Sequence, residues 1–174
     1  MSIFTKRRKV RLSQHRMADS PHGPIRISHD RWPSVIAFVD GPGIPAVTVQ
    51  PRHGLNINGQ RLHTRQGTGN GWDPRRNART CTVVVGDRRY ELRPTGLLRA
   101  RLLRDGMLIA KARRSVRSYS PFRGIPGVDA QLTWSPGVDP TDVAIGQALV
   151  VAYGGGAPGA LARLAFFWLE WFSS

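Results

Sequence analysis

The sequence predicts a mostly β fold: an antiparallel meander that forms a barrel or a sandwich, followed by one or two hydrophobic C-terminal helices. Three observations predict it. Strand-like runs between residues 80 and 113 are separated by turn residues about every eight to ten positions. Closely spaced prolines and glycines in residues 21–60 exclude long helices there. Residues 139–174 are apolar and carry only four charged side chains.

The expected strands are short runs of apolar or β-branched residues, several of them alternating with polar ones. Gly59 marks a turn between two of them, and Asp105-Gly106 is a strong hairpin dipeptide. Residues 66–77 show no alternation and are expected to form a loop. In chain order, the expected strands are 35–39, 46–49, 55–58, 61–64, 80–85, 88–93, 97–104, 107–113 and 130–134.

Two helices are expected after the strands. Asp139 suits an N-cap, Pro140 fits the first turn, and Asp142 suits the positive end of the helix dipole. Residues 143–153 are almost wholly apolar, and three glycines follow them before a second segment at 159–172. A membrane span needs about 20 apolar residues, so neither segment is long enough. We expect the first to be a buried helix; the second packs on the domain, a partner subunit or a bilayer interface.

The expected organisation is a mobile basic arm (1–20), an antiparallel β domain (21–138) and an apolar helical hairpin (139–174). The 174 residues carry a net charge of +15, with 23 arginines among the 26 cations. Residues 1–18 hold six cations and no acid, and residues 61–118 have a net charge of +11. A GC-rich coding sequence would also enrich arginine. The uneven distribution nevertheless indicates an interaction surface for an anionic partner.

The alternation places cations on shared strand faces: Arg89 with Arg93, Arg99 with Arg101, and Lys111 with Arg113. Spaced guanidinium groups can bind successive phosphates, although any half-buried sheet also has a solvated polar face. Trp72 is the one stacking candidate in the basic region. The predicted polyanion-binding residues are Lys6, Arg7, Arg8, Lys9, Arg11, Arg75, Arg76, Arg89, Arg99, Arg101, Lys111, Arg113 and Arg114.

No catalytic signature is present, and an enzyme is the minor interpretation. The glycines of residues 67–71 lack the Lys and Ser/Thr of a P-loop, and the five histidines have no metal-site spacing, so no cofactor and no metal is predicted. A nucleophilic pair of Cys81 with His63 stays open, but Cys81 sits in a strand-like run typical of a core residue.

The lone cysteine and the absence of a secretory signal in the first residues favour a cytoplasmic protein, free or at a membrane surface.

A basic meander followed by a hydrophobic helix resembles the tubby, LURP-one-related and phospholipid-scramblase group. The segments that carry the resemblance are Arg89-Tyr90-Glu91-Leu92, residues 102–110 and residues 142–153, within about 30–153. It implies a closed antiparallel barrel around a central apolar helix, and non-catalytic binding of anionic lipid headgroups. The segment 159–172 and the count of nine expected strands depart from that pattern.

Three function classes remain open. The first is a binding protein for nucleic acid or a ribonucleoprotein, in which about six neutralised phosphates would give a log–log salt slope near −5. The second is a peripheral binder of anionic membranes. The third is a subunit of a homo-oligomer that uses the C-terminal helix as its interface. The expected contacts for a membrane or partner subunit are Phe167, Trp168, Trp171 and Phe172.

Overall fold

The computed structural model describes residues 14–30, 36–50, 54–66, 80–114 and 130–154, and their strands form two six-stranded antiparallel sheets. The order is β1-β2-β3-β4-β5-β6 in the first sheet and β12-β11-β10-β9-β8-β7 in the second. The strands are β1 (Gln14–Ser20), β2 (Gly23–Asp30), β3 (Ile36–Gly41), β4 (Ile44–Gln50), β5 (Gly54–Ile57), β6 (Gln60–Leu62), β7 (Thr64–Gln66), β8 (Cys81–Val85), β9 (Arg88–Pro94), β10 (Arg99–Arg104), β11 (Met107–Arg113) and β12 (Gln131–Trp134).

The first sheet begins earlier than the sequence predicted. Residues 14–20 form β1, which pairs with β2 from Gln14↔His29 to Ser20↔Gly23, so the prediction of a mobile arm through residue 20 is wrong from Gln14 onward. Ile25 and Ile27 alternate along β2 and are both buried. This alternation is short, and it was not predicted as a strand because residues 21–60 are rich in proline and glycine. Expected strand 61–64 also divides: β6 pairs with β5, whereas β7 pairs with β8 in the other sheet.

The second sheet contains the predicted meander. Strands β8, β9, β10, β11 and β12 occupy the regions expected from the alternating pattern. The turn between β10 and β11 has positive φ at both Asp105 (50°) and Gly106 (84°). Two central residues with positive φ define the type I′ hairpin turn that this dipeptide favours, so that prediction is confirmed.

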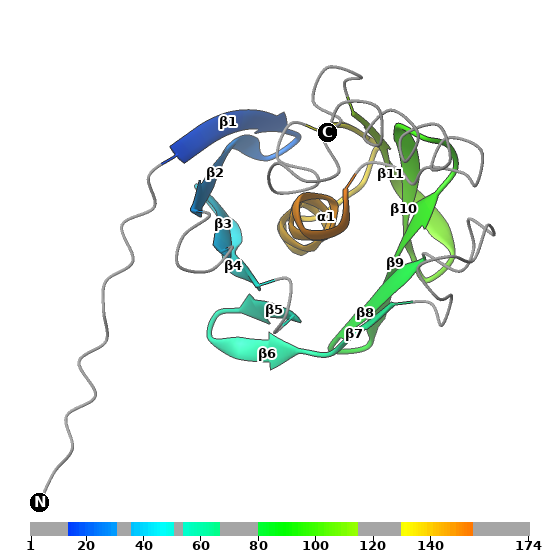
Figure 1. The fold of residues 1–174 in the computed structure, drawn as a ribbon, viewed down its shortest axis with the longest axis horizontal. Helices are drawn as coiled ribbons and strands as arrows, with labels where there is room; N and C mark the ends of the chain where they lie inside the picture. Colours follow the sequence, from blue (N-terminus) through cyan, green and yellow to red (C-terminus); the bar gives the residue numbers. More distant parts are fainter. Residues whose placement is uncertain (1–13, 31–35, 51–53, 67–79, 115–129, 155–174) are drawn as a thin grey trace, which may run out of the picture.

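Helix α1 (Pro140–Tyr153) lies between the two sheets, and Figure 1 shows it nearly end on, with β1–β6 on one side and β7–β11 on the other. It packs against β3 and β4 of the first sheet and β9 and β11 of the second. Its residues from Asp142 to Ala152 are buried all round, as expected for a helix without a polar face. Asp139 is the N-cap and Pro140 lies in the first turn, which confirms the predicted start.

The architecture is sandwich-like. Among the described residues, backbone pairing joins neither β6 to β7 nor β1 to β12. The predicted barrel alternative is therefore wrong, and so is the closed barrel that the resemblance implied. The helix occupies the space where the inner faces of two sandwich sheets would otherwise meet. One helix is described, and the second predicted segment, 159–172, lies outside the described residues.

Candidate polyanion-binding face

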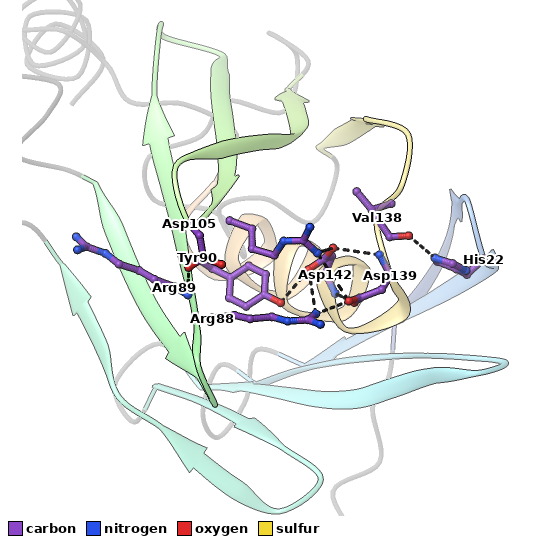
Figure 2. A network of polar contacts seen from close by, with 9 residues as sticks. His22, Arg88, Arg89, Tyr90, Asp105, Val138, Asp139 and Asp142 are labelled. Carbon is purple, nitrogen blue, oxygen red and sulfur yellow. Dashed lines mark hydrogen bonds and ion pairs between the residues drawn. The ribbon is translucent and has the colours of Figure 1, made fainter.

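Arginines on the inner side of the second sheet hold the start of α1. Arg104 Nη1 donates to Asp142 Oδ2 at 2.5 Å, and the Tyr90 hydroxyl donates to Asp142 Oδ1 at 2.9 Å. Arg88 Nη1 donates to Asp139 Oδ2. Figure 2 shows Arg88 and Tyr90 pointing toward Asp139 and Asp142 in the first turn of the helix. The carboxylate of Asp142 is fully buried, so it depends on these donors for its stability.

The two carboxylates also cap the helix. The Asp142 N–H donates to Asp139 Oδ1 at 2.9 Å, and the Asp139 N–H donates to Asp142 Oδ2 at 3.0 Å, forming a reciprocal capping box. Burial acts to raise the pKa of Asp139, but hydrogen bonds from the Asp142 N–H and from Arg88 outweigh it and hold the pKa below its ordinary 3.8. Burial raises the pKa of the Tyr90 phenol, which therefore stays protonated as a donor.

The outward side of the same strands carries a second set of cations. We call it the basic face, and its members are Arg89, Arg93, Arg99, Arg101, Lys111 and Arg113, all of them exposed. Figure 2 shows Arg89 pointing away from the helix while its neighbour Arg88 points toward it. This division follows from the pleat, because successive side chains of a strand point to opposite faces.

The strand register places these cations opposite one another. Arg101 is the partner of Arg93 on β9 and of Lys111 on β11, so three positive side chains form one row across three strands. Arg99 is the partner of Arg113 in a second row. Residues directly opposite in an antiparallel pair have Cα atoms only about 4.5–5.5 Å apart, and like charges there are destabilising.

One carboxylate lies among the outward side chains. Glu91 Oε1 is 2.9 Å from Arg89 Nη2, and Glu91 Oε2 is 2.5 Å from Arg93 Nη2. The remaining four cations form no ion pair with any described carboxylate; they are Arg99, Arg101, Lys111 and Arg113. The basic face therefore keeps an excess of positive charge, which an anionic ligand would neutralise.

No family was found for this chain by comparison with known proteins. Comparison with protein-family models, with curated proteins and with solved structures found no match.

The structure brings together five of the thirteen predicted polyanion-binding residues: Arg89, Arg99, Arg101, Lys111 and Arg113. Arg114 follows β11, where its N–H donates to the Leu98 carbonyl, and its side chain is half-buried rather than on this face. The other predicted contacts lie outside the described residues: Lys6, Arg7, Arg8, Lys9, Arg11, Trp72, Arg75, Arg76, Phe167, Trp168, Trp171 and Phe172.

The predicted site omitted Arg93, although its alternation with Arg89 pointed to the same face. The sequence analysis also did not predict the interactions around Asp142. Arg88 and Arg104 bind the start of the helix across 51 and 38 residues of sequence, and no local pattern indicates contacts over such distances. Pattern alone indicated only the local capping role of Asp139 and Asp142.

Other chemistry finds little support in the described residues. Cys81 is buried, and burial raises the pKa of its thiol to about 12, which opposes formation of a nucleophilic thiolate. No group of three His, Cys, Asp or Glu side chains in the described ranges could hold a metal ion. Within the same ranges, no helix is long and apolar enough to cross a membrane.

Proposed function

We propose that the protein is a non-enzymatic binding protein for nucleic acid, which it holds by its phosphates on the basic face. The observation that carries this proposal is the row of Arg93, Arg101 and Lys111, with the pair Arg99 and Arg113 beside it. Opposed like charges on neighbouring strands cost stability until an anion lies between them. A polymer with regularly spaced phosphates would neutralise several of these cations at once.

The side chains favour contacts to the phosphate backbone over base reading. Five of the six cations are arginines, whose planar guanidinium can bind two phosphate oxygens together. Tyr90 is buried behind the sheet, and the basic face itself contains no aromatic side chain on which a base could stack. We therefore expect weak sequence preference and strong salt dependence.

Salt titration of binding tests the proposal. Fluorescence anisotropy of a labelled duplex DNA, measured across salt concentrations, is expected to give a log–log slope near −5 if about six phosphates are neutralised. The double variant Arg101→Gln with Lys111→Gln should make the slope shallower by about 2 and weaken binding about 60-fold at 0.1 M salt, since each contact contributes about a factor of eight.

A matched control removes the same charge from the first sheet. Arg16 and Arg26 are exposed on β1 and β2, away from the basic face, and their double change to Gln alters the net charge by the same two units. This control should leave the slope nearly unchanged. Equal losses in the two double variants would mean that net charge, rather than the basic face, drives binding.

A second candidate is an anionic membrane surface, favoured by one observation. Met107 is 60% exposed and Leu108 is 36% exposed beside the β10–β11 turn, at one end of the strands that carry the basic face. Apolar side chains beside cations suit the headgroup region of a bilayer. Sedimentation with phosphatidylserine vesicles, lost in a Met107→Ser and Leu108→Ser variant that still binds DNA, would support this candidate.

The resemblance to the tubby, LURP-one-related and phospholipid-scramblase group is part of this second proposal. A buried apolar helix between antiparallel strands supports it, while the open sheets depart from it. It would imply headgroup binding without catalysis. Self-association through the C-terminal segment stays a prediction, since residues 159–172 lie outside the described part of the chain.

A further inference from the structure

A polar groove lies where the chain crosses from one sheet to the other. Strand β6 ends at Leu62, His63 links it to β7, and β8 lies alongside both. The groove has a volume of about 670 Å³. The side chains that line it include Arg61, His63, Arg65, Thr82, Val84 and Arg89. Volumes of about 300–1,000 Å³ are typical of small-molecule sites.

The groove concentrates positive charge. Three guanidinium groups and one imidazole line it, and no carboxylate belongs to its walls. The register places Thr82 between Arg65 on β7 and Glu91 on β9. Glu91 binds Arg89 at 2.9 Å and so offsets part of its charge. Arg65 is exposed and forms no ion pair with a described carboxylate, and Arg61 also lines the groove.

These donors fit a compact anion with several oxygens. A phosphate monoester carries about −1.5 to −2 charges at neutral pH and three acceptor oxygens, so several guanidinium groups that line one groove can bind it together. The Thr82 hydroxyl adds a neutral donor, and Val84 offers an apolar wall for the organic part. A backbone diester has fewer free oxygens and one charge, and it suits a concave site less well.

We propose that this groove binds a phosphate monoester. A soluble organic phosphate and a lipid with a monoester headgroup share this chemistry. The site is separate from the one proposed for nucleic acid, because Arg61, His63 and Arg65 lie on β6, β7 and the link between them, outside β9–β11. It does not depend on the proposed function, and Arg89 is the one residue common to both.

Isothermal titration with adenosine 5′-monophosphate tests the proposal, with adenosine as the control that lacks the phosphate. Saturable binding of the nucleotide but not of the nucleoside is expected. Arg65→Gln should weaken it about tenfold, the usual effect of one lost charge-assisted hydrogen bond. Arg61→Gln changes a second residue that lines the groove, and it should also weaken nucleotide binding. Arg99→Gln, which removes an equal charge from the basic face, should leave nucleotide binding unchanged.

Vesicles identify the source of the phosphate. Phosphatidic acid carries a monoester and phosphatidylglycerol a diester, so preferential sedimentation with the former that Arg65→Gln abolishes would assign the groove to a headgroup. Nucleotide binding without this preference would assign it to a soluble phosphate. Saturable binding of neither monoester, or binding that Arg65→Gln and Arg61→Gln leave intact, would overturn the proposal. DNA binding in the same samples reports separately on the basic face.

Discussion

The two faces of the second sheet use the same residue type for opposite purposes. On the inner face, Arg88 and Arg104 meet Asp139 and Asp142 at the start of α1. On the outer face of β10, Arg101 stands opposite two further cations and pairs with no described carboxylate. Partners, rather than the number of arginines, therefore decide which charges stabilise the fold and which can bind a ligand.

Burial strengthens the contrast. The Asp142 side chain is fully buried and Arg104 is only 19% exposed, so their interaction is little screened by water. Arg89 and Arg93 are 60% and 51% exposed even while they share Glu91. Arg99, Arg101, Lys111 and Arg113 are exposed and pair with no described carboxylate, so they can be exchanged with little effect on the fold. Arg89 and Arg93 differ, because they hold a Glu91 side chain that is only 10% exposed.

The largest expected effect comes from breaking the inner network. Asp142→Asn leaves Arg104 without its closest carboxylate and should lower the free energy of unfolding by about 3 kcal/mol. Chemical denaturation measures it. Tyr90→Phe removes one hydrogen bond from the same carboxylate without changing charge, and should cost about 1 kcal/mol. If Asp142→Asn were as mild as Tyr90→Phe, the inner arginines would not hold the helix.

The second prediction concerns the packing of α1 against the inner face of the second sheet. A Cβ added at Gly146 would lie 2.3 Å from Leu102 Cδ2 and 3.0 Å from the Trp134 ring. Leu102 is fully buried, so Gly146→Ala should cost about 2 kcal/mol through overpacking, despite the higher helix propensity of alanine. Adding Leu102→Val should recover part of this loss in thermal unfolding. If the losses of the two single variants simply added in the double variant, α1 would not be in tight contact with β10 at this point.

The smallest effect is a pH dependence at the helix cap. The folded pKa of Asp139 is lowered, so its contribution to stability is complete above the ordinary value of 3.8 and is lost as the pH falls through the folded value. Asp139→Asn should remove this component, worth less than about 1 kcal/mol because Arg88 and Asp139 are both partly exposed. Urea unfolding between pH 2 and 6 measures it; identical pH profiles for the two proteins would contradict the interpretation.

Sequence pattern predicted the second sheet and the helix well because their signals are local. Alternation, the Asp105-Gly106 turn and the Asp139 cap each act over a few residues. The pairing of β1 with β2 was missed because Pro21, Gly23 and Pro24 resemble a loop, although Ile25 and Ile27 alternate. The split between β6 and β7 could not be predicted, since it depends on which distant strand each one meets.

The candidate site was predictable in the same uneven way. The outward cations of β9, β10 and β11 follow from a period of two. Their row across three strands needs the register, which the positions of the turns only partly set. The groove at Arg61 and Arg65 joins two sheets and has no local signal. Local periodicity thus assigns a side chain to a face, and tertiary contacts decide whether that charge is neutralised.

Arg101 and Arg104 provide the most direct test, because they lie on one strand, on opposite faces, and carry the same charge. Each is changed to Gln, and duplex DNA binding across salt is measured beside denaturant unfolding. Arg101→Gln should make the log–log slope shallower by about 0.9 and weaken binding about eightfold at 0.1 M salt, with unfolding changed by less than about 0.5 kcal/mol. Arg104→Gln should leave the slope unchanged and lower the stability. A slope that falls equally in both variants, or in neither, would contradict the division between a binding face and a stabilising face.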